Sequence, residues 1–191
     1  MAAKSTLTNM ALCLTAVCLV CSALLGATYA VTAEPIAEAS RKALVEAISQ
    51  VLPEGGEISE ANTVEFGGQK YEYYTQSIDG QTSAWAVKST TSGFGGPLTV
   101  LVGVGTDGSV YSTKVLSHTE TPGLGAKCQT DEGFLGQFRG LDPSVKILKV
   151  TKDGGNIDAI TASTITSRAY TLAVANAVEV AKTLKPENKE E

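Results

Sequence analysis

An uncharged, apolar segment near the N-terminus dominates the polarity pattern of this chain. No charged side chain lies between Lys4 and Glu34, and residues 10–30 are almost all apolar or small. As a helix that rises about 1.5 Å per residue, this segment spans about 31 Å, close to the ~30 Å of a bilayer core. The pattern predicts a single transmembrane helix at residues 10–32, after a short tail at residues 1–9.

Cleavage of this segment is the alternative interpretation. Small residues precede Ala30 and Ala33 in patterns that resemble signal-peptide cleavage sites, and Cys21 offers a weaker lipoprotein site. The apolar segment is longer than the ~7–15 residues usual in a signal peptide, which favours a retained helix. Both interpretations place the rest of the chain outside the cytoplasm. We therefore expect a single-pass protein of the cell (inner) membrane with an extracytoplasmic C-terminal domain.

The next segment has the spacing of an amphipathic helix. Apolar side chains recur every three or four residues over residues 36–52, and Pro53 followed by glycines ends the pattern. We expect a stalk helix at residues 33–53, then a globular domain at residues 54–184. A charged tail follows at residues 185–191.

β-Branched and aromatic residues predict several strands in this domain. They fall at residues 71–74, 84–87, 98–104, 110–116 and 145–150. Residues 105–108 predict a hairpin turn. A short helix is expected at residues 131–138, and a long one from about Ser163 to Leu184. This order of elements predicts an α+β fold with a mixed or antiparallel sheet and a long C-terminal helix.

Composition narrows the range of functions. With a net charge of −5, the chain lacks the basic excess of a nucleic-acid binder. Three of the four cysteines lie in the apolar segment, so Cys128 has no partner for a disulfide within the domain. The single histidine, His118, argues against a conventional His-rich metal site. The remaining candidates are a hydroxyl-rich segment and a glycine-rich loop.

Hydroxyl side chains crowd the predicted start of the last helix, in the segment DAITASTITS at residues 158–167. A helix N-terminus presents unpaired N–H groups and the positive end of the helix dipole, which suits a phosphate group. One Ser or Thr is enough to cap a helix, and capping is the simpler explanation of the pattern. The segment holds more hydroxyls than capping needs: Thr161, Ser163, Thr164, Thr166 and Ser167.

Asp158, Thr161 and Thr164, with small residues before the last of them, resemble the flavinylation motif of FMN-binding domains. In that family a separate flavin transferase joins the oxygen of the final Thr to the phosphate of FMN. The resemblance implies covalent FMN on Thr164, with Asp158 and Thr161 as motif residues. Ala162 and Ser163 stand where Gly and Ala are frequent, and the Ser163 hydroxyl is a competing acceptor.

The second candidate is the loop HTETPGLG at residues 118–125. It resembles the loop that lines the flavin ring in the same domains, and residues 93–97 are a weaker third match. Glycines let the backbone approach a flat ligand closely, whereas a lone histidine is more often structural. The resemblance implies that six residues line the isoalloxazine or its ribityl chain: His118, Glu120, Thr121, Gly123, Leu124 and Gly125.

With one membrane segment before these motifs, the whole chain is similar to the G subunit of the Rnf electron-transport complex. The resemblance implies a membrane-anchored flavoprotein that passes electrons inside an ion-translocating ferredoxin:NAD⁺ oxidoreductase. The protein's implied partners are the other membrane subunits and the flavin transferase. It is an electron-transfer component rather than an independent enzyme, because the redox chemistry belongs to the cofactor and no residue needs to be a general acid or base.

Three other interpretations stay open. The related C subunit of the sodium-pumping NADH:quinone reductase is typically longer, so the short chain favours the Rnf protein. A second alternative is an exported FMN-binding module outside the complex, released by cleavage near Ala33. The last alternative is an extracytoplasmic scaffold whose flavin site is vestigial.

Overall fold

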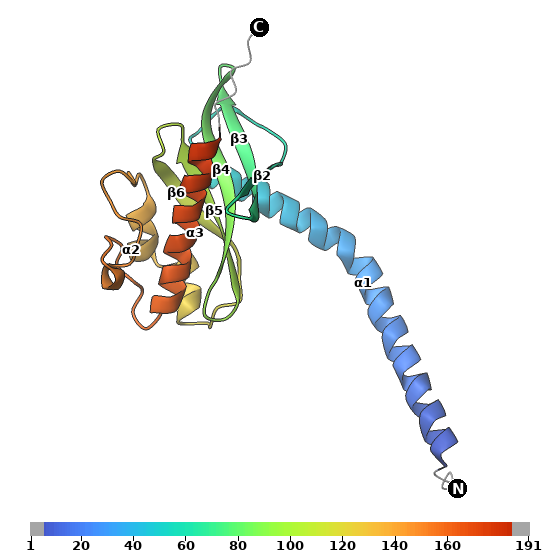
Figure 1. The fold of residues 1–191 in the computed structure, drawn as a ribbon. Coiled ribbons are helices and arrows are strands. Elements are labelled where there is room, and N and C mark those ends of the chain that lie inside the picture. Colours follow the sequence, from blue (N-terminus) through green and yellow to red (C-terminus); the bar gives the residue numbers. More distant parts are fainter. Residues whose placement is uncertain (1–5, 185–191) are drawn as a thin grey trace. The chain divides into compact units, whose positions relative to one another are not determined.

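The computed structural model describes residues 6–184 (Figure 1). Its internal contacts divide the chain between Ala43 and Leu44 into two units. The first unit is the helical part of α1 (Leu7–Val51) that precedes this division. Its large apolar side chains are exposed. Among the residues described, α1 is the one helix long and apolar enough to cross a membrane.

α1 is one continuous helix through Pro35, where the sequence predicts a transmembrane helix and a separate stalk. Hydroxyls in its apolar part bond to the helix backbone. Thr15 donates to the Ala11 carbonyl at 2.9 Å, and Thr28 donates to the Leu24 carbonyl at 2.8 Å. These bonds satisfy polar groups that a hydrocarbon environment would leave unpaired, so the threonines are compatible with a membrane span.

The second unit is built on a six-stranded sheet in the order β1-β3-β4-β5-β6, with β2 paired to β3 outside this path. The strands are β1 (Glu57–Ile58), β2 (Asn62–Phe66), β3 (Gln69–Ile78), β4 (Gln81–Ser92), β5 (Pro97–Gly105) and β6 (Val110–His118). All named neighbours pair antiparallel, and the predicted hairpin at residues 105–108 joins β5 to β6. The predicted α+β class is confirmed.

β5 is buried on both faces of the sheet. Val100 packs in one cluster with the helix α3 (Thr164–Thr183), while Leu101 packs in the other with Ile48 from the last turns of α1. Coverage on both faces explains why β5 is a continuous apolar segment rather than an alternating one. The compact unit starts at Leu44, inside the predicted stalk, because the end of α1 forms one layer of its core.

The predicted short helix is present as α2 (Glu132–Leu135) with a 3₁₀ turn after it (Gly136–Phe138). Its aromatic side chains pack against α3. The Phe134 and Phe138 rings each lie 5.1 Å from the Tyr170 ring, centroid to centroid. This cluster fixes α3 against the segment that follows β6.

The predicted strand at residues 145–150 is wrong. Val145 and Ile147 are exposed, and within this segment only Val150 forms a bridge, a parallel one with Ile157. β-Propensity alone does not make a strand, because an extended segment also needs a partner strand and a surface to cover. Two strands were not expected from the pattern, β1 and β2, which are short and mostly exposed.

Candidate functional site

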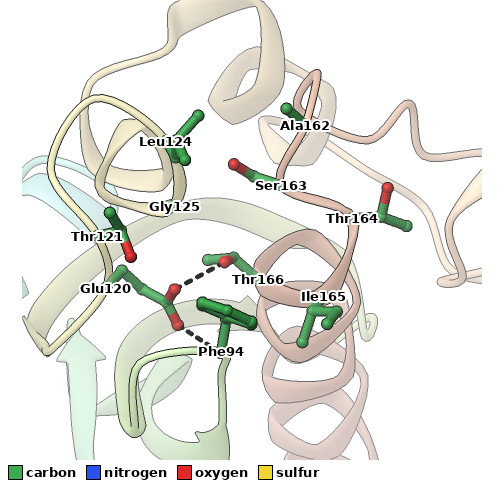
Figure 2. Close-up of a pocket in the computed structure, with 10 residues that line it drawn as sticks. All are labelled: Phe94, Glu120, Thr121, Leu124, Gly125, Ala162, Ser163, Thr164, Ile165 and Thr166. Atoms are coloured by element: carbon green, nitrogen blue, oxygen red, sulfur yellow. Dashed lines mark hydrogen bonds between the residues drawn. The ribbon is translucent and has the colours of Figure 1, made fainter.

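A cavity of about 340 Å³ lies where three segments meet: the turn between β4 and β5, the loop after β6, and the start of α3 (Figure 2). Residues 120–125 form one side of the cavity, the loop wall, and residues 162–166 form another side, the motif wall. The lining residues are Phe94, Glu120, Thr121, Leu124, Gly125, Ala162, Ser163, Thr164, Ile165 and Thr166.

Glu120 connects the three segments. It is buried, with an exposed fraction of 5%. One carboxylate oxygen accepts a hydrogen bond from the Phe94 backbone N–H at 2.8 Å, and the other accepts from the Thr166 hydroxyl at 2.8 Å. A buried charge is stable only when it is paired or hydrogen-bonded, so these two bonds allow the carboxylate to stay there.

Two glycines make room for this carboxylate. A Cβ atom at Gly93 would collide with Oε1 of Glu120, and one at Gly125 would collide with Oε2. Gly123 has a φ of +78°, a conformation that L side chains rarely adopt. The glycine-rich character of the loop therefore has a local cause, since the backbone has to pass close to a buried acid.

The motif wall folds back on itself before α3 begins. The Ser167 hydroxyl accepts a bond from the Ile160 N–H at 3.0 Å and donates to the Ser163 carbonyl at 3.0 Å. Between them Ala162 has a φ of +61°, uncommon for a residue with a side chain. Ser163 occupies the N-cap position, but its side chain makes no capping bond. Capping therefore does not account for the Ser163 hydroxyl.

Thr164, the predicted acceptor, is half-buried and lines the cavity at the first residue of α3. The Lys152 ammonium donates to its hydroxyl at 3.3 Å. Next to Lys152, Asp153 accepts two bonds of 2.7 Å from the Arg168 guanidinium, which connects this turn to α3. The Arg168 bonds also hold the pKa of the Asp153 carboxyl below its usual value.

The cavity brings together six of the ten predicted site residues: Glu120, Thr121, Leu124, Gly125, Ser163 and Thr164. His118, Gly123, Asp158 and Thr161 do not line it. His118 ends β6, and its Nδ1 accepts the Glu120 backbone N–H at 3.2 Å, so it orients the buried acid. The backbone of Asp158 exchanges two bonds with the Gln137 side chain. A flavin role stays a prediction for all ten residues.

Phe94, Ala162, Ile165 and Thr166 line the cavity but were not predicted as site residues, and Lys152 was missed beside it. Phe94 lies in the weak third match at residues 93–97, which was the available signal. Apolar side chains are exposed around the cavity: Phe94 at 68%, Ile165 at 51% and Leu124 at 46%. Exposed apolar groups around a concave site are typical of a place where a flat apolar ligand binds.

Cys128 lies in the 3₁₀ turn Gly125–Gln129 that follows the loop wall, and it is fully buried. Burial, together with the negative charge of Glu120, raises the pKa of the Cys128 thiol to about 11. At neutral pH it stays protonated, and a protonated thiol is a poor nucleophile. These properties argue against a nucleophilic role for Cys128.

Two family patterns match this sequence. The pattern described as the FMN-binding domain matches residues 93–179, which include both cavity walls. The pattern described as the RnfG N-terminal region matches residues 1–51, which include α1.

Curated relatives match nearly the whole chain. The G subunit of the ion-translocating oxidoreductase complex of Vibrio cholerae is 37% identical over 174 residues, covering 84% of this chain and 83% of that protein. The G subunit of the proton-translocating ferredoxin:NAD(+) oxidoreductase complex of Clostridium ljungdahlii is 34% identical over 169 residues, covering 87% and 86%. Among solved structures, the C subunit of the Na⁺-translocating NADH-quinone reductase from Parabacteroides distasonis has a TM-score of 0.49 at 23% identity. The match covers 67% of this chain and 79% of that one.

Proposed function

Because this chain belongs to the RnfG family, the G subunits of ion-translocating oxidoreductase (Rnf) complexes, we propose that it carries FMN on Thr164 inside such a complex. The predicted resemblance to this family is confirmed. The chain is a flavoprotein of an ion-translocating oxidoreductase complex. The covalent bond, the flavin transferase that makes it, and the ferredoxin-to-NAD⁺ direction of electron flow are parts of the proposal.

One observation carries the assignment of the acceptor: Thr164 lies at the edge of the cavity, at the N-terminus of α3 and beside the Lys152 ammonium. A 20-residue helix presents its unpaired N–H groups and positive dipole end at this point. Both features attract a phosphate, and a lysine nearby adds a full positive charge. The site therefore favours the phosphate end of FMN at the Thr164 hydroxyl.

The remaining lining residues fit the rest of the molecule. Phe94, Leu124 and Ile165 offer exposed apolar surface to a flat ring, and Glu120 fixes the loop wall in place before any ligand arrives. A volume of about 340 Å³ lies in the range of small-molecule sites, ~300–1,000 Å³. FMN held by these residues would supply the redox chemistry of electron transfer between partner subunits.

We place this domain outside the cytoplasm, anchored by α1 as a single-pass helix of the cell membrane. The apolar helix and the family of membrane-complex subunits support association with a membrane. A covalent bond prevents loss of the cofactor by dissociation, which matters most where the cell cannot replace it. The other membrane subunits of the complex are then the electron partners.

Substitution of Thr164 tests the acceptor. The full chain is produced with a flavin transferase, denatured, separated on a gel and examined for flavin fluorescence. Thr164→Val should lose the fluorescent band completely, while Thr164→Ser, which keeps a hydroxyl, should retain part of it. Thr151→Val, a nearby exposed threonine, is the control and should stay fluorescent. Fluorescence retained by Thr164→Val would contradict the assignment, and the flavin-bearing peptide would then show whether Ser163 is modified.

Extraction of the membrane fraction tests the anchor. The full chain should stay in the membrane after alkaline washing and should keep an intact N-terminus. A protease-sensitive tag after residue 191 should be cut by protease added outside spheroplasts. A soluble chain beginning near Glu34 would instead favour the exported module. A tag protected from the protease would indicate the opposite orientation of the domain.

A further inference from the structure

Ser163 has a buried hydroxyl with no partner. Its exposed fraction is 7%, and its Oγ makes no hydrogen bond to any residue in the part of the chain that the structure describes. Two other buried side-chain atoms there share this property, Oε1 of Gln76 and Oγ of Ser89. Of the three residues, Ser163 alone lines the cavity.

An unpaired buried hydroxyl is unfavourable in the protein by itself. Burial removes the hydrogen bonds that such a group makes to water and here supplies no bond in their place. Ser167, one turn further along α3, shows the usual solution, because its buried hydroxyl both accepts and donates a bond. The Ser163 hydroxyl therefore differs from its neighbour in a way that a group entering the cavity would correct.

The Ser163 and Thr164 side chains point to different places. Figure 2 shows the Ser163 hydroxyl directed toward the Leu124 side of the cavity, with the Thr164 hydroxyl directed away from it. The Thr164 hydroxyl already has the Lys152 ammonium as a partner at 3.3 Å. A phosphate group is attracted to the Thr164 hydroxyl, which lies next to the Lys152 ammonium. An uncharged polar group suits the Ser163 hydroxyl.

We infer that the Ser163 hydroxyl is a hydrogen-bonding contact to the polar atoms of the bound flavin, and not a second phosphate acceptor. This rests on the proposed function, since it requires FMN in the cavity. Ser163 is then a flavin-binding residue, distinct from the acceptor Thr164. The flavin completes a hydrogen bond that the folded chain leaves open.

A thermodynamic cycle tests this contact. Thermal unfolding of the full chain in detergent is measured with and without covalent flavin, for the wild type and for Ser163→Ala. Without flavin, Ser163→Ala should have a Tm equal to or above that of the wild type, since it removes an unpaired group. The rise in Tm caused by the flavin should be smaller in Ser163→Ala than in the wild type.

Two matched controls separate this effect from general packing. Ser89→Ala removes another unpaired buried hydroxyl, away from the cavity, and should leave the flavin-induced rise in Tm unchanged. Ser167→Ala removes a hydroxyl with two partners and should lower the Tm of both forms by a similar amount.

The possible results lead to different conclusions. A smaller flavin-induced rise in Ser163→Ala alone, with the flavin mass still on Thr164, supports the contact. An equal rise in wild type and Ser163→Ala overturns it and leaves the proposed function standing. Flavin found on Ser163 of the wild type also overturns it. A wild-type chain that takes up no flavin refutes the proposed function and this inference together.

Discussion

The two walls of the cavity differ in how their polar side chains are hydrogen-bonded. In the loop wall, the buried Glu120 carboxylate has protein partners for both oxygens. In the motif wall, the Ser163 hydroxyl has no partner in the described chain, and the Thr164 hydroxyl contacts a lysine side chain. The loop wall is complete without a ligand, whereas the motif wall leaves a hydroxyl that, on our inference, the flavin completes. Changes to Glu120 and its hydrogen-bond partners should alter folding stability, and changes around Thr164 should alter flavin attachment.

Glu120→Ala should have the largest effect on stability. It removes the acceptor for both the Phe94 N–H and the Thr166 hydroxyl. Loss of two charge-assisted bonds inside the protein should lower the free energy of unfolding by about 3 kcal/mol. Chemical denaturation of the flavin-free chain measures this. Glu179→Ala, which removes an exposed ion pair with Lys182, should cost less than about 1 kcal/mol. Equal effects would mean that the loop wall is not held by Glu120.

Thr166→Val should have the next largest effect. The shape of the side chain is kept, but one oxygen of the buried carboxylate loses its donor. We expect a loss of about 1–2 kcal/mol in the same denaturation experiment. The double variant Glu120→Ala/Thr166→Val should lose less than the sum of the single losses, because both changes remove one interaction. Simple additivity would contradict a direct bond.

Lys152→Met probes the motif wall and should leave stability nearly unchanged. Its ammonium lies on an exposed side chain beside the Thr164 hydroxyl, so we expect it to act on an incoming phosphate. The initial rate of flavin attachment by a flavin transferase in vitro should fall roughly three- to tenfold, which corresponds to about 0.7–1.4 kcal/mol. Lys146→Met, an exposed lysine in the preceding loop, is the control and should load at the wild-type rate. Equal rates of flavin attachment for the two variants would show that Lys152 does not act on the incoming phosphate.

The smallest expected effect comes from the ion pair behind the motif wall. The Arg168 guanidinium lowers the pKa of Asp153, so the charged carboxylate stabilises the folded state above its unfolded pKa of about 3.9. This contribution should disappear as the pH falls through the lowered folded pKa. The stability difference between wild type and Asp153→Asn should therefore be small at pH 7 and should shrink as the pH falls below the unfolded pKa. A stability difference between the two proteins that grows on acidification would contradict a stabilising Asp153–Arg168 ion pair.

Much of the fold follows from local sequence patterns. The hairpin at residues 105–108 has turn residues between the two strands that it joins. The helix α3 begins at Thr164, one residue after the predicted start at Ser163. Strands and helices that bury one face can be predicted from the sequence, because their apolar residues recur with the period of that face. Residues 145–150 have such a pattern without a partner strand, and no local pattern reveals that absence.

The site was predictable where a short motif carries it and not where side chains from distant segments meet. The sequence pointed to Thr164, Glu120 and their neighbours through resemblance. Phe94 reaches the cavity because its backbone N–H bonds to Glu120, 26 residues later in the chain. A contact over that separation depends on how the β4–β5 turn and the loop after β6 pack together.

By itself, the sequence determined the apolar helix, the antiparallel strands, the glycine-rich loop and the hydroxyl-rich start of the last helix. These depend on periodicity, charge and backbone freedom, which are properties of neighbouring residues. Only the tertiary structure decided that the end of α1 belongs to the domain core and that Ser163 and Thr164 face different surroundings. Adjacent hydroxyls look equivalent in a sequence, and the packing around each one determines which has a partner and which is left for a ligand.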